Sequence, residues 1–529
     1  MESAAHSLQT VFLLLLLFVA IFALVAQRLR VPYPIVLVIA GLGLSLVPGV
    51  PDVELNPDTI FFVVLPLLLN WAAWHTSWLS LRRNAWSIFV LAFGLVVFTV
   101  FGVAAAAPWF LSGFDWRTGF LLGAVIAPTD AIAATSIARR LHLPQRIVDI
   151  IEGESLINDA SGLLALQIGV SMIMAGRTPT VVESLGRLAF MTVAGTAIGI
   201  AVGFVVDRFE RVVDDASIVI AITLLVPYAA YFAAERVHAS GVLAVIASGL
   251  YHSRNSVSYR PARVRLQAEV VWNTMAFIIN GLVFVLIGLQ LPAVLAGLKG
   301  TSLATLLGYV LIFSAIVIAL RMVWVFPALS VGRARLDGRS KFLIGWASMR
   351  GVIALAAALS LPLVLPDGRP FPQRAMIIFL TFGGIFTSLV MKGLTLPALI
   401  RRLGLAGRDD SSTEEVEARK ALVRAGIEYL DRARERGEVF DEHHEDLREH
   451  YATRLAALND EPVDDHGSAA EHAARYREIS RGMLRAERAE AVRMRDENRI
   501  TDDVLRELLT DLDLAETRLN VEIEKAARR

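Results

Sequence analysis

Acidic and polar side chains interrupt a long apolar segment of the chain. Residues 151–162 read IEGESLINDASG, and the apolar run LLALQIGVSMIMA follows at once. At helical spacing Glu154 and Asn158 are neighbours one turn apart, as are Ser155 and Asp159, so together they form one polar stripe. Hard cations prefer oxygen ligands, a rule that we extend here from calcium and magnesium to monovalent ions. The stripe therefore predicts a site for a small cation.

Asp159 is the side chain that we expect to bind either that cation or a proton. Burial disfavours the charged form of a carboxyl group, whereas a bound cation favours it. Proton and cation would then exclude each other at one carboxylate, and exchange follows if only the loaded states can change their orientation. The alternative for Asp159 is an interhelical acid with a purely structural role.

Glu154 lies on the same stripe, but we expect a different role for it. Arg350 is a basic residue in the middle of another apolar segment, and an opposite charge is its natural neighbour. We therefore predict a structural Glu154–Arg350 ion pair rather than a direct ligand role for Glu154. Glu152 and Asp149 lie near the start of the predicted helix, where an acid complements the helix dipole, so we interpret both as capping residues.

The elements that carry these residues are predicted to be membrane-spanning helices. The chain has 529 residues, of which 55% are hydrophobic, and its mean hydropathy is +0.55. Repeated apolar runs of about 18 residues or more are typical of membrane helices, in which the backbone groups are paired internally. We predict an all-α polytopic membrane protein with about thirteen transmembrane helices. The predicted segments lie near 8–27, 34–48, 58–80, 84–112, 115–141, 144–175, 180–207, 215–235, 239–253, 267–295, 301–330, 341–363 and 371–402.

The charges of the connecting loops predict the orientation of these helices. The odd-numbered loops and the residues after the last segment hold roughly twenty Lys and Arg residues, against about seven in the even-numbered loops. Because cytoplasmic loops are enriched in Lys and Arg, we place the N-terminus outside and the C-terminal tail in the cytoplasm. The first apolar run lacks the positive lead of a secretory signal, so we expect it to be a retained helix.

The fifth and twelfth segments are interrupted. The fifth reads GFLLGAVIAPTDAIAATSIARR, in which Pro128 disfavours helix just before Thr129 and Asp130. The twelfth reads KFLIGWASMRGVIALAAALSLP and places Arg350 and Gly351 in mid-segment. Two inverted six-helix repeats flanking a seventh helix would make these two segments equivalent, and such pairs mark the substrate sites of secondary transporters. Asp130 is then a candidate ligand or orienting residue, and two kinks without a ligand are the alternative.

These stretches together resemble the monovalent cation/proton antiporter family, of the bacterial sodium/proton exchanger type. The similarity covers about residues 10–405 and rests on GAVIAPTDAIAATSI, PQRIVDIIEGESLINDASGLL, SGVLAVIASGLYHSR, FIINGLVFVLIGLQL and GWASMRGVIALAAALSLP. It implies crossed interrupted helices and a homodimer whose subunits each have a core ion-translocation part and a dimer-interface part.

The resemblance also implies roles for single residues. Thr129 and Asp130 match the unwound crossing helix, and Ser155 matches an ion ligand. The Asn158–Asp159 pair goes with electroneutral one-for-one exchange in this family. The site residues expected from the sequence are therefore Asp159, Asp130, Ser155, Thr129 and Asn158 for cation and proton, with Na⁺ at Asp159, Asp130, Ser155 and Thr129, and Glu154 with Arg350 as a buried ion pair.

The chain departs from the family pattern at three positions. Ala131 stands where Pro is common, Ser348 where Gly is common, and Asn70 where an acid is usual. The last change bears on ion preference or on the pH profile. His75, beside several Trp residues, could sense pH or serve as an interfacial polar residue.

The chain is predicted to divide into a transmembrane domain, residues 1–405, and a cytoplasmic helical domain, residues 406–529. In the latter we expect helices from Ser412 onward and near 441–458, 468–497 and 500–527, with NDEPVDDHGS as a linker. Its five histidines are interpreted as solvated, with pH sensing or metal binding as the alternative; they are His443, His444, His450, His466 and His472.

Taken together, these features predict a secondary antiporter of a bacterial inner membrane that exchanges Na⁺ or Li⁺ for H⁺. The formal net charge of zero gives no sign of a nucleic-acid partner, and without cysteine there is no disulfide or thiolate metal site. We expect no cofactor and no enzymatic activity. The alternatives are a K⁺/H⁺ antiporter and, less favoured, a gated cation channel, for which no selectivity-filter signature is present. An intramembrane hydrolase is disfavoured because Ser155 has no nearby His and no G-x-S-x-G elbow.

Overall fold

The structure is a computed structural model in which two units are compact, Met1–Arg408 and Asp409–Arg529. Each is described by itself. The described residues are 2–29, 31–47, 57–176, 180–213, 215–256, 260, 262–298, 300–331, 336–407 and 411–437, with short stretches beyond them.

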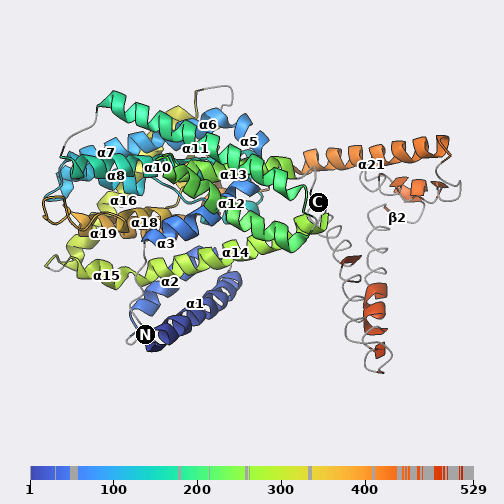
Figure 1. The fold of residues 1–529 in the computed structure, drawn as a ribbon, viewed down its shortest axis with the longest axis horizontal. Coiled ribbons are helices and arrows are strands. Elements are labelled where there is room, and N and C mark those ends of the chain that lie inside the picture. The colour runs from blue at the N-terminus through green and yellow to red at the C-terminus, as the bar shows by residue number, and fades with distance from the viewer. Residues whose placement is uncertain are drawn as a thin grey trace. The chain divides into compact units, whose positions relative to one another are not determined.

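Helices coincide with each of the first six predicted segments (Figure 1). Three of these segments contain a π-helical turn or a break that divides them. The bounds are α1 (Glu2–Leu29), α2 (Tyr33–Ser45), α3 (Pro57–Thr59), η1 (Ile60–Val64), α4 (Leu65–His75), α5 (Trp78–Arg83), α6 (Ala85–Phe89), η2 (Val90–Leu95), α7 (Val96–Phe110), α8 (Trp116–Ile126), α9 (Ile132–Arg140) and α10 (Gln145–Met174).

Helices also coincide with the seventh to the thirteenth segments. Their bounds are α11 (Val181–Glu210), α12 (Ala216–Arg236), α13 (Gly241–Ser256), α14 (Ala262–Leu289), α15 (Leu291–Ala296), α16 (Leu303–Ala328), α17 (Gly338–Ala347), α18 (Val352–Leu359), α19 (Arg374–Thr387), η3 (Ser388–Lys392) and α20 (Gly393–Leu403).

By length and composition, eight helices among the described residues are long and apolar enough to cross a membrane, and three more are shorter apolar helices. The prediction of a helical, polytopic membrane protein is confirmed. The exact count of thirteen and the inverted repeats stay predictions.

Polar caps fix where the first halves of the two interrupted segments begin. Asp115 accepts a hydrogen bond from the backbone of Thr118 at 2.8 Å and starts α8. Asp337 does the same for Ser340 at 3.2 Å and starts α17. Such side chains satisfy backbone donors that have no partner within the helix, so both half-helices are positioned by local sequence.

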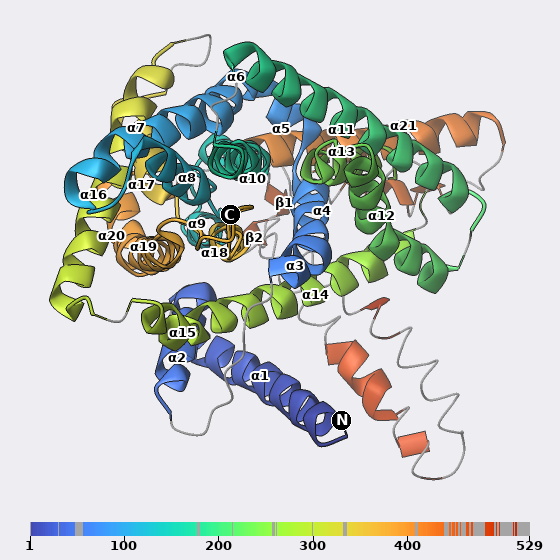
Figure 2. The same cartoon turned by 60° about the vertical axis from the view of Figure 1, so that its left-hand side comes forward.

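The long helix α10 lies between two apolar cores. Figure 2 shows it nearly end-on, with α8 on its left, α4 on its right and α18 below it. Its residues belong to a large apolar cluster shared with α7, α8, α16, α17, α18 and α19. They also belong to a second cluster shared with α4, α12 and α13. The stripe of polar residues on α10 is therefore held in the middle of the unit.

Close packing of α2 on α14 forms one wall of this arrangement. A Cβ atom at Gly41 would lie 2.4 Å from the carbonyl oxygen of Val285, and one at Gly288 would lie 2.4 Å from that of Val38. Glycines at a crossing let two membrane helices approach through their backbones. Larger side chains at either position would separate the two helices.

The described part of the C-terminal unit contains α21 (Ser411–Glu435) and two short strands. The strands β1 (Pro462–Asp464) and β2 (Gly467–Ser468) pair antiparallel within the predicted linker. The interpretation of His444 as solvated is wrong, because this residue is buried and its ring nitrogen lies 2.9 Å from the Asp431 carboxylate. The other four histidines of the tail lie outside the described residues, as do most of the three helices predicted after α21.

Candidate cation and proton site

The two interrupted helices meet at their breaks. The fifth segment is helical to Ile126, as α8, and again from Ile132, as α9. The twelfth is helical to Ala347, as α17, and again from Val352, as α18. Between them the backbone nitrogen of Asp130 donates a hydrogen bond to the carbonyl oxygen of Met349 at 2.9 Å, as an antiparallel bridge. The predicted interruptions are thus confirmed, and the unwound stretches pair with each other.

Buried cations lie at the ends of both first half-helices. The Arg350 guanidinium donates to the carbonyl oxygens of Ala127 at 3.0 Å and Pro128 at 3.3 Å, at the end of α8. The Lys392 ammonium donates to the carbonyl of Ser348 at 2.7 Å, at the end of α17. Helix C-termini carry partial negative charge and unpaired carbonyls, so both broken ends are neutralised from within the protein.

Asp130 lies at the start of the second half-helices. Its Oδ1 accepts a hydrogen bond from the backbone of Ile132, the first residue of α9, at 2.8 Å. A Cβ atom at Gly351, which precedes α18, would lie 2.4 Å from Oδ2 of the same carboxylate. Only glycine leaves room for the acid at this place, so Asp130 complements the partial positive charge of α9 and closely approaches the start of α18.

Two side chains of α10 hold the unwound stretch beside Asp130. The Ser155 hydroxyl donates to the carbonyl of Thr129 at 2.7 Å and accepts from the backbone of Ala131 at 3.1 Å. Asn158 donates to the Thr129 hydroxyl at 2.6 Å and accepts from the Thr129 backbone at 3.3 Å. These bonds replace the helical pairing that the break removes. The structure therefore brings four of the five predicted cation-site residues together through these bonds.

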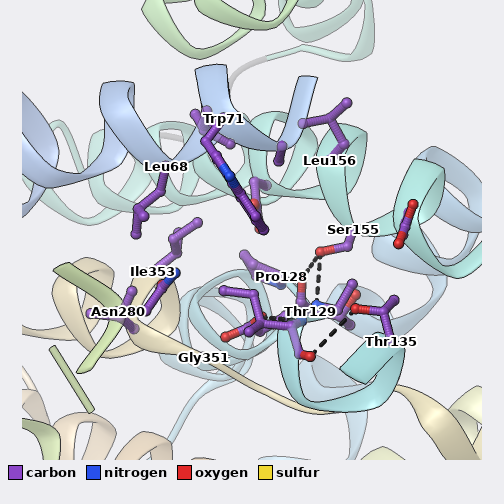
Figure 3. Close-up of a pocket in the computed structure, with 18 of the residues that line it drawn as sticks. Leu68, Trp71, Pro128, Thr129, Thr135, Ser155, Leu156, Asn280, Gly351 and Ile353 are labelled. Carbon is purple, nitrogen blue, oxygen red and sulfur yellow. Dashed lines mark hydrogen bonds between the residues drawn. The ribbon is translucent and has the colours of Figure 1, made fainter. Parts of the chain in front are cut away.

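Asp159 faces a cavity of about 320 Å³ next to this stretch. The residue is 6% exposed, and no hydrogen bond or ion pair to its carboxylate is found among the residues that the structure describes. The same cavity is lined by Thr129, Asp130 and Ser155. Figure 3 shows Leu68 and Trp71 of α4 projecting into the space that Ser155 and Thr129 border. The cavity thus offers one unpaired carboxylate among further oxygen atoms.

The predicted ion pair between Glu154 and Arg350 is wrong: Glu154 is in a buried ion pair, but its partner is not Arg350. Glu154 instead forms a bidentate pair with Arg321 of α16, with nitrogen–oxygen distances of 2.6 and 2.8 Å. Both side chains are buried. Arg321 also donates to the carbonyls of Gly345 and Ile344 near the end of α17. The rotation of α10 points Glu154 toward α16, while Arg350 turns to the end of α8.

Arg321 and Lys392 are the buried charged residues beside the broken helices that sequence reasoning missed. Each is an ionisable residue inside an apolar segment, and that alone marks it for attention because charge at membrane depth is costly. The capping interpretation of Glu152 and Asp149 is also wrong, because neither acid lies in the first turn of α10. The helix α10 begins at Gln145, about two turns earlier, and Glu152 pairs with Arg139 at 2.7 Å.

The family departures lie in distinct places. Asn70 faces a separate small space with Trp74, Thr223 and His252, away from Asp159. Ala131 and Ser348 both belong to the unwound stretches. His75 lines the main cavity, where its ring nitrogen contacts the carbonyl of Trp71 at 2.8 Å.

The comparison with known proteins decides the family. The sequence model of one protein family, the transmembrane region of sodium/hydrogen exchangers, matches residues 13–402. The chain belongs to the sodium/hydrogen exchanger family. As a member of this family it is a transporter rather than an enzyme, and a multi-pass membrane protein that exchanges monovalent cations for protons.

Relatives of this exchanger are similar over most of its length. One, named an uncharacterized Na⁺/H⁺ exchanger of Mycobacterium tuberculosis, is 31% identical over 518 residues, 95% of this chain and 94% of the relative. Another, named a sodium, potassium, lithium and rubidium/H⁺ antiporter of Bacillus subtilis, is 31% identical over 413 residues, 74% of this chain and 61% of the relative. The fold is similar to that of the sodium/proton antiporter MjNhaP1 from Methanocaldococcus jannaschii, with a TM-score of 0.62 and 17% identity, covering 74% of this chain and 97% of that one.

Proposed function

We propose that this exchanger moves Na⁺ against H⁺, one for one, by competition of the two ions at Asp159. The observation that carries the proposal is the unpaired Asp159 carboxylate in a cavity that Asp130, Ser155 and Thr129 also line. Burial favours the neutral acid when no cation is bound, and a bound cation favours the carboxylate. Either state is then nearly neutral, whereas the empty carboxylate is a buried charge that resists a change of orientation.

The neighbours of Asp159 support an electroneutral cycle. Asn158 is an amide and carries no titratable proton, and Arg321 already balances Glu154. Asp130 accepts the backbone hydrogen bond of Ile132 at the start of α9, so we assign it to orienting the site and to supplying an oxygen ligand. One titrating carboxylate per site gives one proton for one cation.

The oxygen ligands are consistent with Na⁺ or Li⁺ as the substrate cation. We propose Asp159, Asp130, Ser155 and Thr129 as the residues that bind it, since carboxylate, hydroxyl and carbonyl oxygens suit small hard cations. The Bacillus subtilis relative is named for transport of sodium, potassium, lithium and rubidium. K⁺/H⁺ exchange is therefore the second candidate.

We also propose that the protein is a homodimer in a bacterial inner membrane. The excess of Lys and Arg in the odd-numbered loops supports an outside N-terminus and a cytoplasmic tail. Protease accessibility of the two ends in sealed vesicles tests this orientation. Cleavage of the tail from the periplasmic side would contradict it.

Proton movement in proteoliposomes tests the exchange itself. Adding Na⁺ outside acidified vesicles should raise their internal pH, with K⁺ and valinomycin holding the membrane potential at zero. Asp159→Asn should abolish this response, while Asp149→Asn, on the same helix but away from the cavity, should retain it. Full exchange in Asp159→Asn would contradict the proposal. A Na⁺ current without proton movement would favour the channel instead.

A further inference from the structure

A second carboxylate of α10 lines the same cavity as Asp159. Glu152, Ser155 and Asp159 stand at positions i, i+3 and i+7, and all three border the cavity. At about 1.5 Å rise per residue, Glu152 lies roughly 10 Å along the helix from Asp159 and on nearly the same face. The three side chains thus form a line of oxygen atoms that leads to the site.

Glu152 marks the solvent-exposed end of this line, on the side of the membrane that the loop charges assign to the cytoplasm. Its partner Arg139, on α9, also lines the cavity, and the two are 2.7 Å apart. The Arg139 side chain is 60% exposed and that of Glu152 is 20% exposed, so the cavity opens at this end. Asp149 on the same helix and His75 on α4 are the other titratable groups near enough to influence Glu152.

The ion pair between Arg139 and Glu152 is well placed to open. A half-exposed pair of this kind contributes little to stability because water screens it and the long side chain loses freedom in forming it. A cation that reaches Glu152 can replace the guanidinium of Arg139 as the positive partner of this carboxylate. Among the residues that the structure describes, Arg139 is the ion-pair partner of Glu152, whereas Glu154 pairs with an arginine that further buried hydrogen bonds hold in place.

We propose that Glu152 positions the incoming cation at the open end of the cavity, and that Arg139 competes with the cation for Glu152. The inference rests on cation/proton exchange at Asp159. Cation and guanidinium alternate as the partner of one carboxylate, so the Glu152–Arg139 pair sets the apparent affinity for the cation. The exchange step at Asp159 keeps its maximal rate.

Initial rates against Na⁺ concentration test this in proteoliposomes. Glu152→Gln should raise the KM for Na⁺ by about threefold to tenfold and leave the maximal rate within about twofold, because a unit charge roughly 10 Å away acts partly screened. Arg139→Gln should shift KM in the opposite direction. Both shifts should shrink as an inert organic salt raises the ionic strength.

The matched control is Asp149→Asn. Its carboxylate lies about one turn from Glu152 on the same helix, accepts a hydrogen bond from Gln145 and does not line the cavity. It should change KM less than Glu152→Gln does. An unchanged KM in Glu152→Gln, an equal shift in Asp149→Asn, or a fall in maximal rate alone overturns the proposal. In each case wild-type protein still exchanges Na⁺ for H⁺. Absence of exchange in the wild type instead refutes the proposed function and with it this inference.

Discussion

Removal of Arg321 is expected to destabilise this exchanger more than most substitutions. Arg321→Met leaves the Glu154 carboxylate buried without its partner, where two nitrogen–oxygen contacts of 2.6 and 2.8 Å had satisfied it. Both side chains are only 2% exposed, so water cannot replace the guanidinium. Losing one member of a buried pair costs about 3–5 kcal/mol. Unfolding by denaturant in detergent should show a loss of this size.

A double-mutant cycle identifies the partner of Glu154. Glu154→Gln combined with Arg321→Met should give a coupling energy of about 2 kcal/mol or more, whereas Glu154→Gln combined with Arg350→Met should give less than about 1 kcal/mol. A larger coupling with Arg350, or a loss below about 1 kcal/mol in Arg321→Met, would refute the assignment of the pair.

Three further substitutions test the site and its supports. Gly351→Ala would place a Cβ atom 2.4 Å from the Asp130 carboxylate, so exchange in proteoliposomes should be lost while circular dichroism stays helical; Gly308→Ala, with no atom within 4 Å, should be active. Asn158→Ala removes two hydrogen bonds to the unwound stretch and should lower the unfolding free energy by about 1–3 kcal/mol; an unchanged midpoint in denaturant would contradict this. Asp337→Ala removes the cap of α17 and should cost about 0.5–2 kcal/mol at neutral pH. The Ser340 hydrogen bonds hold the pKa of Asp337 below its usual value. The stabilisation is therefore complete at pH values above the usual pKa of an aspartate and is lost as the pH falls through the folded-state pKa. The unfolding free energies of wild type and variant should converge in acid.

The positions of the helix breaks could be predicted because their causes are local. Pro128 cannot donate a backbone hydrogen bond, and Gly351 lets a carboxylate approach the backbone. The polar stripe of α10 follows from helical spacing alone. Each of these signals lies within a few residues of the feature that it predicts, so one sequence suffices to find the breaks and the polar stripe that meet at the candidate site.

The partner of Glu154 could not be predicted in this way. Arg321 is 167 positions away along the chain, and which base a buried acid meets depends on how helices rotate against one another. Arg350 and Lys392 were equally available by charge, yet both turn to carbonyls at the broken helix ends. The π-helical turn that ends at Lys392 also has no signature in the local apolar pattern.

Proton release on cation binding tests the central claim most directly. Purified protein in weakly buffered detergent is titrated with Na⁺, and bound Na⁺ and released H⁺ are measured together. Competition at Asp159 predicts about one proton released per Na⁺ bound at a pH where the carboxyl group is protonated, and neither event in Asp159→Asn. Sodium binding without proton release, or equal release from Asp159→Asn, would contradict the account.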